Sequence, residues 1–181
     1  MNQRFKKDFY RMTEQQFTGS LKDMIRIILH HNLYFMYLFR KYEMRKSFLT
    51  RFLLYRITRK YGLELSVDAT IGEGLYLGHP YNITVSEGTV IGNNVNLHKG
   101  CTIGRENRGK RFGAPTIGNR VFVGINATVV GKITIGDDVL IAPNSYVNRD
   151  IPAHSIVIGN PAQIYSRENA TENYVNFFIN N

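Results

Sequence analysis

Residues 117–148 read IGNRVFVGINATVVGKITIGDDVLIAPNSYVN, and an aliphatic residue stands at every sixth position of this stretch. The positions are Ile117, Val123, Val129, Ile135, Ile141 and Val147. A period of six fits neither an amphipathic helix nor a two-sided strand. Self-similarity at this fixed period is typical of a parallel β-helix, in which each unit is a short strand plus a turn and three units close one coil. The stretch therefore predicts a mainly β fold whose aliphatic residues stack inside a solenoid.

The repeat extends toward the N-terminus with two interruptions. It includes Ile71, Leu77 and Ile83, slips by two residues, and resumes at Val85, Ile91, Leu97 and Ile103. From Ile103 to Ile117 the chain holds 14 residues, eight more than one unit, and residues 105–116 read RENRGKRFGAPT. An excursion from a regular coil is typical of a functional loop, although a neutral insertion is the alternative. Basic side chains suit phosphates or an anionic acceptor, so we expect acceptor-binding residues here, namely Arg105, Arg108 and Arg111.

The N-terminal third has a different pattern. Residues 20–61 show apolar residues at three- and four-residue spacings, with Ser47 as a candidate N-cap and Gly62 as a candidate C-terminal cap. The most apolar stretch, residues 24–39, is shorter than a bilayer span and contains Arg26, so it does not predict a transmembrane helix. We therefore expect an N-terminal helical region over 1–63, a β-helix domain over 64–165 and a C-terminal tail over 166–181.

The charge is concentrated in the helical region. Residues 1–63 carry 14 Lys and Arg against 4 Asp and Glu, whereas the remaining 118 residues carry 9 against 10. A basic, aromatic-rich helical segment leaves peripheral contact with anionic lipid open, although a solvated helical face is the more ordinary interpretation. We expect no nucleic-acid partner. The single cysteine, Cys101, excludes a disulfide framework, and the first twenty residues are too polar for a signal peptide, so the sequence favours a cytoplasmic protein.

Residues 121–162, VFVGINATVVGKITIGDDVLIAPNSYVNRDIPAHSIVIGNPA, resemble the C-terminal half of serine acetyltransferases. They resemble more closely the saccharide O-acetyltransferases of the same hexapeptide-repeat branch, which act in polysaccharide biosynthesis. The resemblance covers about residues 64–164. It implies a left-handed β-helix, a homotrimer and a transferase that takes acetyl-CoA as co-substrate in a groove between subunits. It further implies an acetyltransferase with a saccharide or nucleotide-sugar acceptor and no metal.

The resemblance also carries two catalytic residues. The catalytic histidine of serine acetyltransferases, which belongs to an Asp-His pair, matches His79, and the aspartate that orients it matches Glu64, with the same separation of fifteen residues. A hydroxyl is a weak nucleophile near neutral pH, so a base must take its proton, and a carboxylate fixes the tautomer of that base. Two positions depart from the pattern: the aspartate of the pair is Gly78, and a second active-site histidine of that family falls on Ala114. These losses favour a sugar hydroxyl over serine as acceptor.

Other site residues follow from the same resemblance. His98 lies one residue away from the position that stacks on His79, and it is either an acceptor contact or a structural corner residue. The family holds CoA along backbone amides at coil edges, with basic residues near the phosphates. The matching positions here are Gly104, Gly124, Asn126, Ala127, Ala142, Lys132 and Pro161.

Three alternatives remain. The first is a serine O-acetyltransferase of cysteine biosynthesis. The second, from another class, is a non-catalytic scaffold or membrane-associated module that uses the basic helices. The third is a zinc enzyme of the γ-carbonic anhydrase type, which needs three converging histidines, whereas only His79 and His98 lie in the coils.

Overall fold

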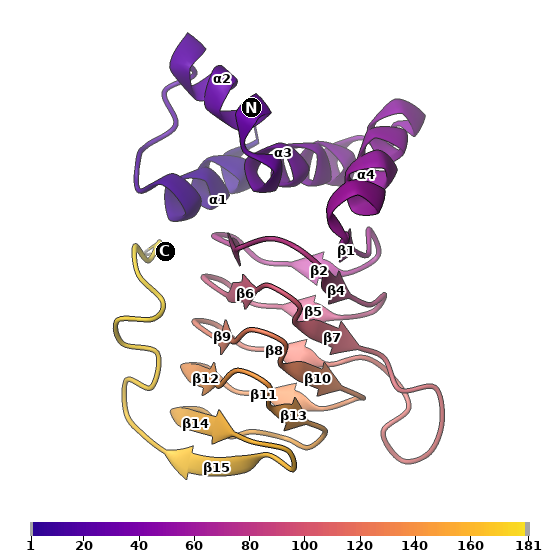
Figure 1. Ribbon diagram of the computed structural model, residues 1–181, viewed down its shortest axis with the longest axis vertical. Helices are drawn as coiled ribbons and strands as arrows, with labels where there is room; N and C mark the ends of the chain where they lie inside the picture. Colours follow the sequence, from indigo (N-terminus) through magenta and orange to yellow (C-terminus); the bar gives the residue numbers. More distant parts are fainter. Residues whose placement is uncertain (1, 180–181) are drawn as a thin grey trace.

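The computed structural model describes residues 2–179, and it shows a β-solenoid with helices stacked on one end (Figure 1). The helical end consists of α1 (Gln3–Thr13), α2 (Leu21–Leu29), α3 (His31–Met44) and α4 (Phe48–Tyr61). Fifteen short strands follow, wound into three parallel sheets that run the length of the solenoid. The predicted mainly β fold with N-terminal helices is confirmed.

Up to β13 each sheet takes every third strand, because each coil contributes one strand to each face. The first sheet contains β1 (Leu63–Leu65), β4 (Ile83–Val85), β7 (Thr102–Gly104), β10 (Thr128–Val130) and β13 (Tyr146–Val147). The second contains β2 (Thr70–Ile71), β5 (Val90–Ile91), β8 (Thr116–Ile117) and β11 (Thr134–Ile135). The third contains β3 (Tyr76–Gly78), β6 (Asn96–His98), β9 (Phe122–Val123), β12 (Val139–Ile141), β14 (Ser155–Ile158) and β15 (Gln163–Ser166), of which only β15 is antiparallel to its neighbour.

The core of the solenoid is the set of residues at the six-residue spacing. Every aliphatic residue of the repeat from Ile71 to Val147 is at most 1% exposed. The register stacks like on like: Ile91 lies beside Ile71, and Ile117 beside Ile91. Burial of a full Val, Leu or Ile side chain contributes about 1.5–3 kcal/mol. The repeat read from the sequence is therefore the apolar column that holds the coils together.

Glycines allow the coils to approach closely at the corner between the second and third sheets. A Cβ on Gly72 would lie 2.5 Å from the carbonyl oxygen of Gly92 in the next coil, and a Cβ on Gly92 would lie 2.7 Å from that of Gly118. A larger residue at either position would collide with backbone, which explains why small residues follow the aliphatic position.

A buried ion pair seats the helices on the first coil. Arg40 of α3 donates to Asp8 of α1 at 2.8 Å, and both side chains are fully buried. The same guanidinium donates to the carbonyls of Ile71 and Gly72, and Asp8 accepts the backbone N–H of Leu75. These contacts join the helical region to the start of the solenoid, and they are not part of the six-residue repeat.

The helical prediction is partly confirmed. The range 20–61 divides into α2, α3 and α4, and α1 precedes that range but lies within the helical region expected over 1–63. Gly62 caps α4 with a φ of 67°, whereas Ser47 stands at the N-cap position without a side-chain hydrogen bond. Among residues 2–179, no helix combines the length and hydropathy needed to cross a membrane.

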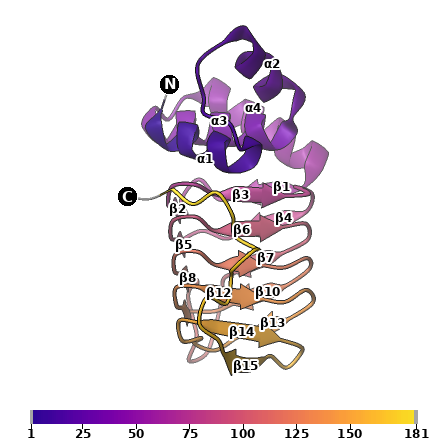
Figure 2. The ribbon, with the colours of Figure 1, turned by 90° about the vertical axis from the view of Figure 1, so that its left-hand side faces the viewer.

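The C-terminal segment, residues 167–179, runs back along the third sheet toward the helices (Figure 2). Asp138 accepts hydrogen bonds from the backbone N–H and the hydroxyl of Thr171, at 3.0 and 2.6 Å. Burial alone would raise the pKa of Asp138, but the hydrogen bonds, those of Thr171 first, outweigh it and hold the pKa below its usual value. Nearer the helices, the Asn96 side chain donates to the carbonyl of Tyr174 at 3.0 Å. Residues 180 and 181, the end of the predicted tail, lie outside the described residues.

Candidate active site

His79 projects from an enlarged corner of the first coil. The strand pairing advances 20 residues from Tyr76 in β3 to Asn96 in β6, but 18 residues from Thr84 in β4 to Thr102 in β7. The corner after β3 therefore holds two more residues than the corner of the next coil, and this explains the slip in the repeat. His79 lies in this corner, exposed and with a φ of 47°. A positive φ is uncommon for a residue other than glycine, but it recurs at the corners of this solenoid, for example at Asn126 and His154.

His98 lies directly against Gly78. The two residues are register partners in β6 and β3, as the count of the repeat predicted. A Cβ on Gly78 would stand 2.5 Å from Nδ1 of His98, because the imidazole ring covers that Cα, and the other side of the ring packs on Phe122 at 4.5 Å between centroids. The replacement of the pair's aspartate by glycine thus makes room for His98.

His98 is neutral at physiological pH. Burial first, and then the proximity of His79, lowers its pKa to about 4. Its Nε2 is buried and has no hydrogen-bond partner within residues 2–179. The two histidines therefore differ in environment: His79 faces solvent, and His98 is an uncharged ring beside it.

Four of the seven predicted CoA-binding residues lie at the same corner of the prism as His79. Gly124, Asn126 and Ala127 follow β9, and Ala142 follows β12. Backbone hydrogen bonds connect this corner from coil to coil, from Lys99 N–H to the Gly78 carbonyl and from Asn126 N–H to the Lys99 carbonyl. Ala127 and Gly124 are buried and Ala142 is half-buried, whereas Ile125 and Asn126 are exposed at this edge.

The loop that follows β7 lies at another corner, between the first and second sheets (Figure 1). Arg105 stacks on the Phe112 ring at 4.8 Å and lies 3.4 Å from a Glu87 oxygen. Arg111 pairs with Glu106 at 3.1 Å and its carbonyl accepts the N–H of Lys132, whereas Arg108 is exposed. Gly104 and Lys132 belong to this corner too. Within one chain, the structure does not bring the loop arginines to His79.

Glu64 and Pro161 belong to other elements than the corner that holds His79. Glu64 is an exposed residue of β1, in register with Thr84, and it lines a groove with Ser66 and Ser86. Among the described residues no hydrogen bond joins Glu64 to His79, so their pairing stays a prediction. Pro161 lies in the turn between β14 and β15, at the opposite end of the solenoid from the helices.

Comparisons with known proteins agree with this geometry. Residues 114–149 match the family model described as bacterial transferase hexapeptide (six repeats). Within residues 114–149 the repeat of the solenoid is similar to the repeat of that family. A serine acetyltransferase of Helicobacter pylori is 38% identical over 107 residues, which cover 59% of this chain and 63% of the relative. The chain therefore matches less than two thirds of that relative's length.

Two solved structures extend the likeness of this hexapeptide-repeat chain. A serine acetyltransferase from Neisseria gonorrhoeae matches with a TM-score of 0.71 and 28% identity, over 91% of this chain and 64% of that one. A serine acetyltransferase in complex with CoA matches with a TM-score of 0.63 and 26% identity, over 75% of this chain and 56% of that one. The similarity is thus to serine acetyltransferases, and the closer likeness to saccharide O-acetyltransferases expected from the sequence finds no support.

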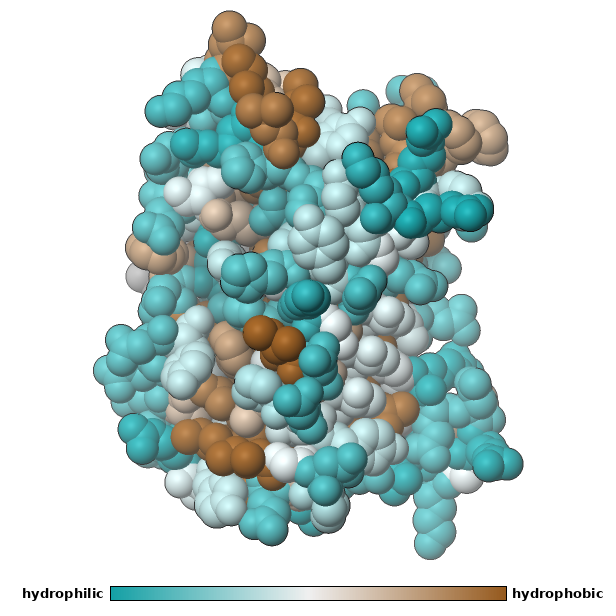
Figure 3. All heavy atoms as spheres, viewed as in Figure 1, coloured by the Kyte–Doolittle hydropathy of each residue, from teal (hydrophilic) through white to brown (hydrophobic). Residues whose placement is uncertain are grey.

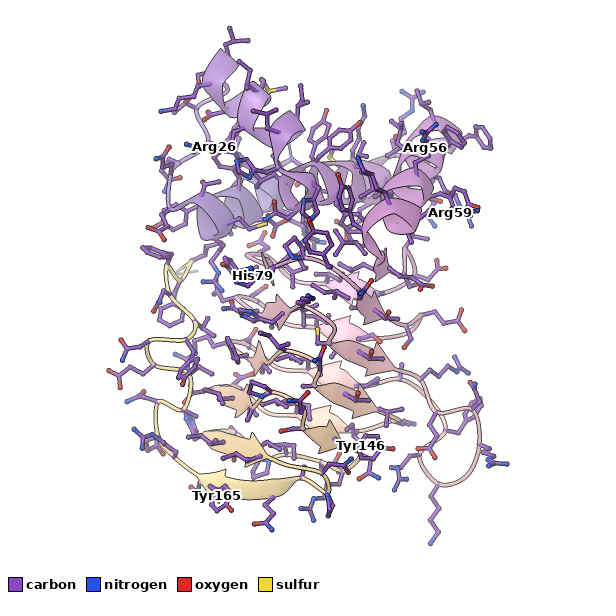
Figure 4. The ribbon with its side chains drawn as sticks, viewed as in Figure 1. Arg26, Arg56, Arg59, His79, Tyr146 and Tyr165 are labelled. Carbon is purple, nitrogen blue, oxygen red and sulfur yellow. The ribbon has the colours of Figure 1, made fainter. Side chains whose placement is uncertain are left out.

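The helical region contributes residues that the sequence did not indicate. The Nε2 atom of His31 lies 3.2 Å from the carbonyl oxygen of Pro80, next to His79, and the His31 ring stacks on Tyr61 at 4.2 Å. Tyr81 packs against both rings. Figure 4 shows His79 on the part of the hexapeptide-repeat solenoid nearest the helices. These contacts join residues far apart in the chain and follow no repeat, so no sequence pattern predicted them.

Proposed function

We propose that this chain transfers the acetyl group of acetyl-CoA to a hydroxyl acceptor, with His79 as the general base. The observation that carries the proposal is the exposed imidazole of His79 at the head of a solenoid corner whose lower positions are Gly124, Ala127 and Ala142. The similarity to serine acetyltransferases, one of them in complex with CoA, supports the same chemistry. The pantetheine arm would lie along this edge past the exposed Asn126 and present the thioester to that imidazole.

The reaction needs one base that becomes an acid. His79 takes the proton of the acceptor hydroxyl as its oxygen attacks the thioester carbonyl. The new C–O bond forms, the C–S bond breaks, and the imidazolium returns the proton to the CoA thiolate. A positioned base of this kind contributes about 10²–10⁴ in rate. His98 remains uncharged beside His79. The imidazole of His79 is therefore free to carry the proton.

We further propose that the active site is completed by a second copy of the chain in a homotrimer. The loop arginines and His79 occupy different corners of the prism, so a neighbouring subunit must present its loop for Arg105, Arg108 and Arg111 to reach the acceptor or the CoA phosphates. Gly104 and Lys132 would join the groove from that neighbour. A mixture of His79→Ala with a variant that replaces the three arginines by Gln tests this, because mixed trimers should regain activity that neither parent has.

The comparisons favour L-serine as the acceptor, since the relatives are serine acetyltransferases. Two observations favour a saccharide or nucleotide sugar instead. The His98 ring fills the space in which a side chain at position 78 would lie, and Ala114 stands where the resemblance places a second histidine. Both changes remove groups that hold an amino-acid acceptor in the serine acetyltransferases.

Release of free CoA thiol, measured with L-serine and with a panel of sugars and nucleotide sugars, decides between these acceptors. Turnover with L-serine alone would establish the serine O-acetyltransferase reaction and remove the saccharide. Turnover with a sugar alone would do the reverse. Binding of CoA without turnover on any acceptor would contradict the enzyme and favour the scaffold alternative. The acetyl-CoA requirement and the free, buried Cys101 favour action in the cytoplasm.

A further inference from the structure

The outer face of α2 is apolar although none of the described residues covers it. Residues spaced to form one stripe of a helix normally face a core. On α2 the stripe is turned to solvent, and Leu29, for example, is 74% exposed. Of the nine residues of this helix, only Asp23 and Ile27 are buried. The exposed stripe consists of Leu21, Met24, Ile25, Ile28 and Leu29.

A second apolar patch lies at the start of α4. Phe48 is 86% exposed, and Leu49, Phe52 and Tyr55 are exposed on the following turns. Figure 3 shows both sets as hydrophobic surface at the end of the molecule that the helices form. We call the exposed apolar residues of α2 and α4, with the basic residues between and around them, the cap face.

Cations predominate around these apolar side chains, although Glu64, Asp68 and Glu87 line a groove with Arg51 and Tyr55 where α4 meets the solenoid. Lys22 and Arg26 flank the stripe on α2, and the exposed cations on α4 are Arg51, Arg56, Arg59 and Lys60. α4 contains no Asp or Glu, and the one acid of α2, Asp23, is buried and accepts hydrogen bonds from residues 18 and 19. The cap face is therefore both apolar and positively charged.

A groove connects the two patches. It has a volume of about 610 Å³ and is lined by apolar residues that include Ile28, Leu29 and Leu53, and by the cations Arg56, Arg59 and Lys60. An apolar floor with cations at its rim matches a molecule that has hydrocarbon chains below an anionic head group.

We propose that the cap face docks on an anionic lipid bilayer. Amphipathic helices with Phe and Leu on one side and Lys or Arg at the margin lie in the interface with the apolar side buried about 5–10 Å deep. The helices lie at one end of the solenoid (Figure 1), so docking leaves the His79 corner in water close to the lipid surface. The docking is independent of the reaction proposed for His79.

A second copy of the chain and a nucleic acid are the two other candidate occupants of the cap face, and each matches only one of its two properties. A second copy seated on the same face would bring Arg56, Arg59 and Lys60 against their own counterparts, and like charges across an interface are costly. Nucleic acid would neutralise these cations but would leave Phe48 and Leu29 exposed to water. A membrane satisfies both properties at once.

The test is flotation of the full chain with vesicles of phosphatidylcholine alone and of phosphatidylcholine mixed with phosphatidylglycerol. We expect binding to the mixed vesicles, weakened by salt. Arg56→Gln combined with Arg59→Gln should reduce partitioning on the order of 20-fold, because each cation near an anionic surface contributes about fivefold. Ile28→Ser combined with Leu29→Ser should reduce it as well. These side chains are exposed, so the thermal midpoint should not change.

Matched controls lie at the far end of the solenoid. Tyr165→Ser and Arg167→Gln alter an exposed aromatic and an exposed cation there, and they should bind vesicles like the parent chain. Binding to neither type of vesicle, or equal loss in the controls, would overturn the proposal. The proposal would also be overturned if Ile28→Ser combined with Leu29→Ser lowered the oligomeric state in light scattering and left vesicle binding unchanged. A second copy of the chain would then cover the face. Retention on duplex DNA without vesicle binding would also overturn it.

Discussion

The solenoid and the helical region are held together in different ways. In the solenoid, one type of contact is repeated: an aliphatic residue stacks on its counterpart in the next coil, from Ile71 to Val147. In the helical region, single contacts decide the arrangement, above all the buried pair of Asp8 and Arg40. A repeated contact spreads its stabilisation over many positions. A single buried ion pair concentrates it, so the two regions should respond differently to substitution.

The largest expected effect is in the helical region. Arg40→Ala should lower the free energy of unfolding by about 3–5 kcal/mol, because it leaves the carboxylate of Asp8 buried without its partner. Chemical denaturation followed by circular dichroism measures this. Asp8→Asn combined with Arg40→Met should cost less than Arg40→Ala alone, and an equal cost would show that the charge of Asp8 is not the reason.

The next effect tests the contact between Gly78 and His98. Gly78→Ala should destabilise by about 1–3 kcal/mol, since its Cβ must displace the His98 ring. The double variant Gly78→Ala with His98→Ala removes the obstacle, so the two substitutions should be less costly together than their sum. Simple additivity of the two thermal or chemical unfolding measurements would contradict the close approach.

A smaller effect is expected for one position of the repeated core. Ile117→Val should cost about 0.5–1.5 kcal/mol, because it removes one buried methylene from a column of similar contacts. Ile91→Val or Ile135→Val should lower the free energy of unfolding by a similar amount. A cost that differed greatly among these three positions would show that the coils are less equivalent than the register indicates.

A further prediction concerns pH. The pKa of His98 is lowered to about 4 from an ordinary value of 6.5, so below pH 6.5 the unfolded chain binds a proton that the folded chain does not. The contribution of neutral His98 to the free energy of unfolding should therefore be present above pH 6.5 and be lost as the pH falls toward 4. His98→Gln should flatten the pH dependence of stability in this interval, and an unchanged curve would contradict the burial of the ring.

The six-residue period was sufficient to predict the solenoid core. Ile117 and Val123 could be placed inside because their spacing fits only one kind of coil. The slip between Ile83 and Val85 was visible in the sequence, but only the strand register shows that the two extra residues lie in the corner that His79 occupies. The spacing also put His98 one residue out of register with His79, which the pairing of His98 with Gly78 confirms. The left-handed sense of the coil does not follow from the period and rested on resemblance alone.

Contacts that occur once could not be read in this way. The pairing of Asp8 with Arg40, and that of Asp138 with Thr171, depends on how distant segments meet in space. The same holds for His31, which reaches Pro80 from a helix. The loop shows a different limit, because its composition indicated anion binding, whereas only the topology revealed that Arg105 lies at another corner than His79.

The central claim is that His79 acts as the base of an acetyl transfer from acetyl-CoA. The most direct test compares thiol release and CoA binding, by calorimetry, in the parent chain and in His79→Ala, with whichever acceptor supports turnover. The account predicts that turnover falls by about 10²–10⁴ while the affinity for CoA is nearly unchanged, because the base contributes in the transition state and not to cofactor binding. Unimpaired turnover in His79→Ala would contradict the account.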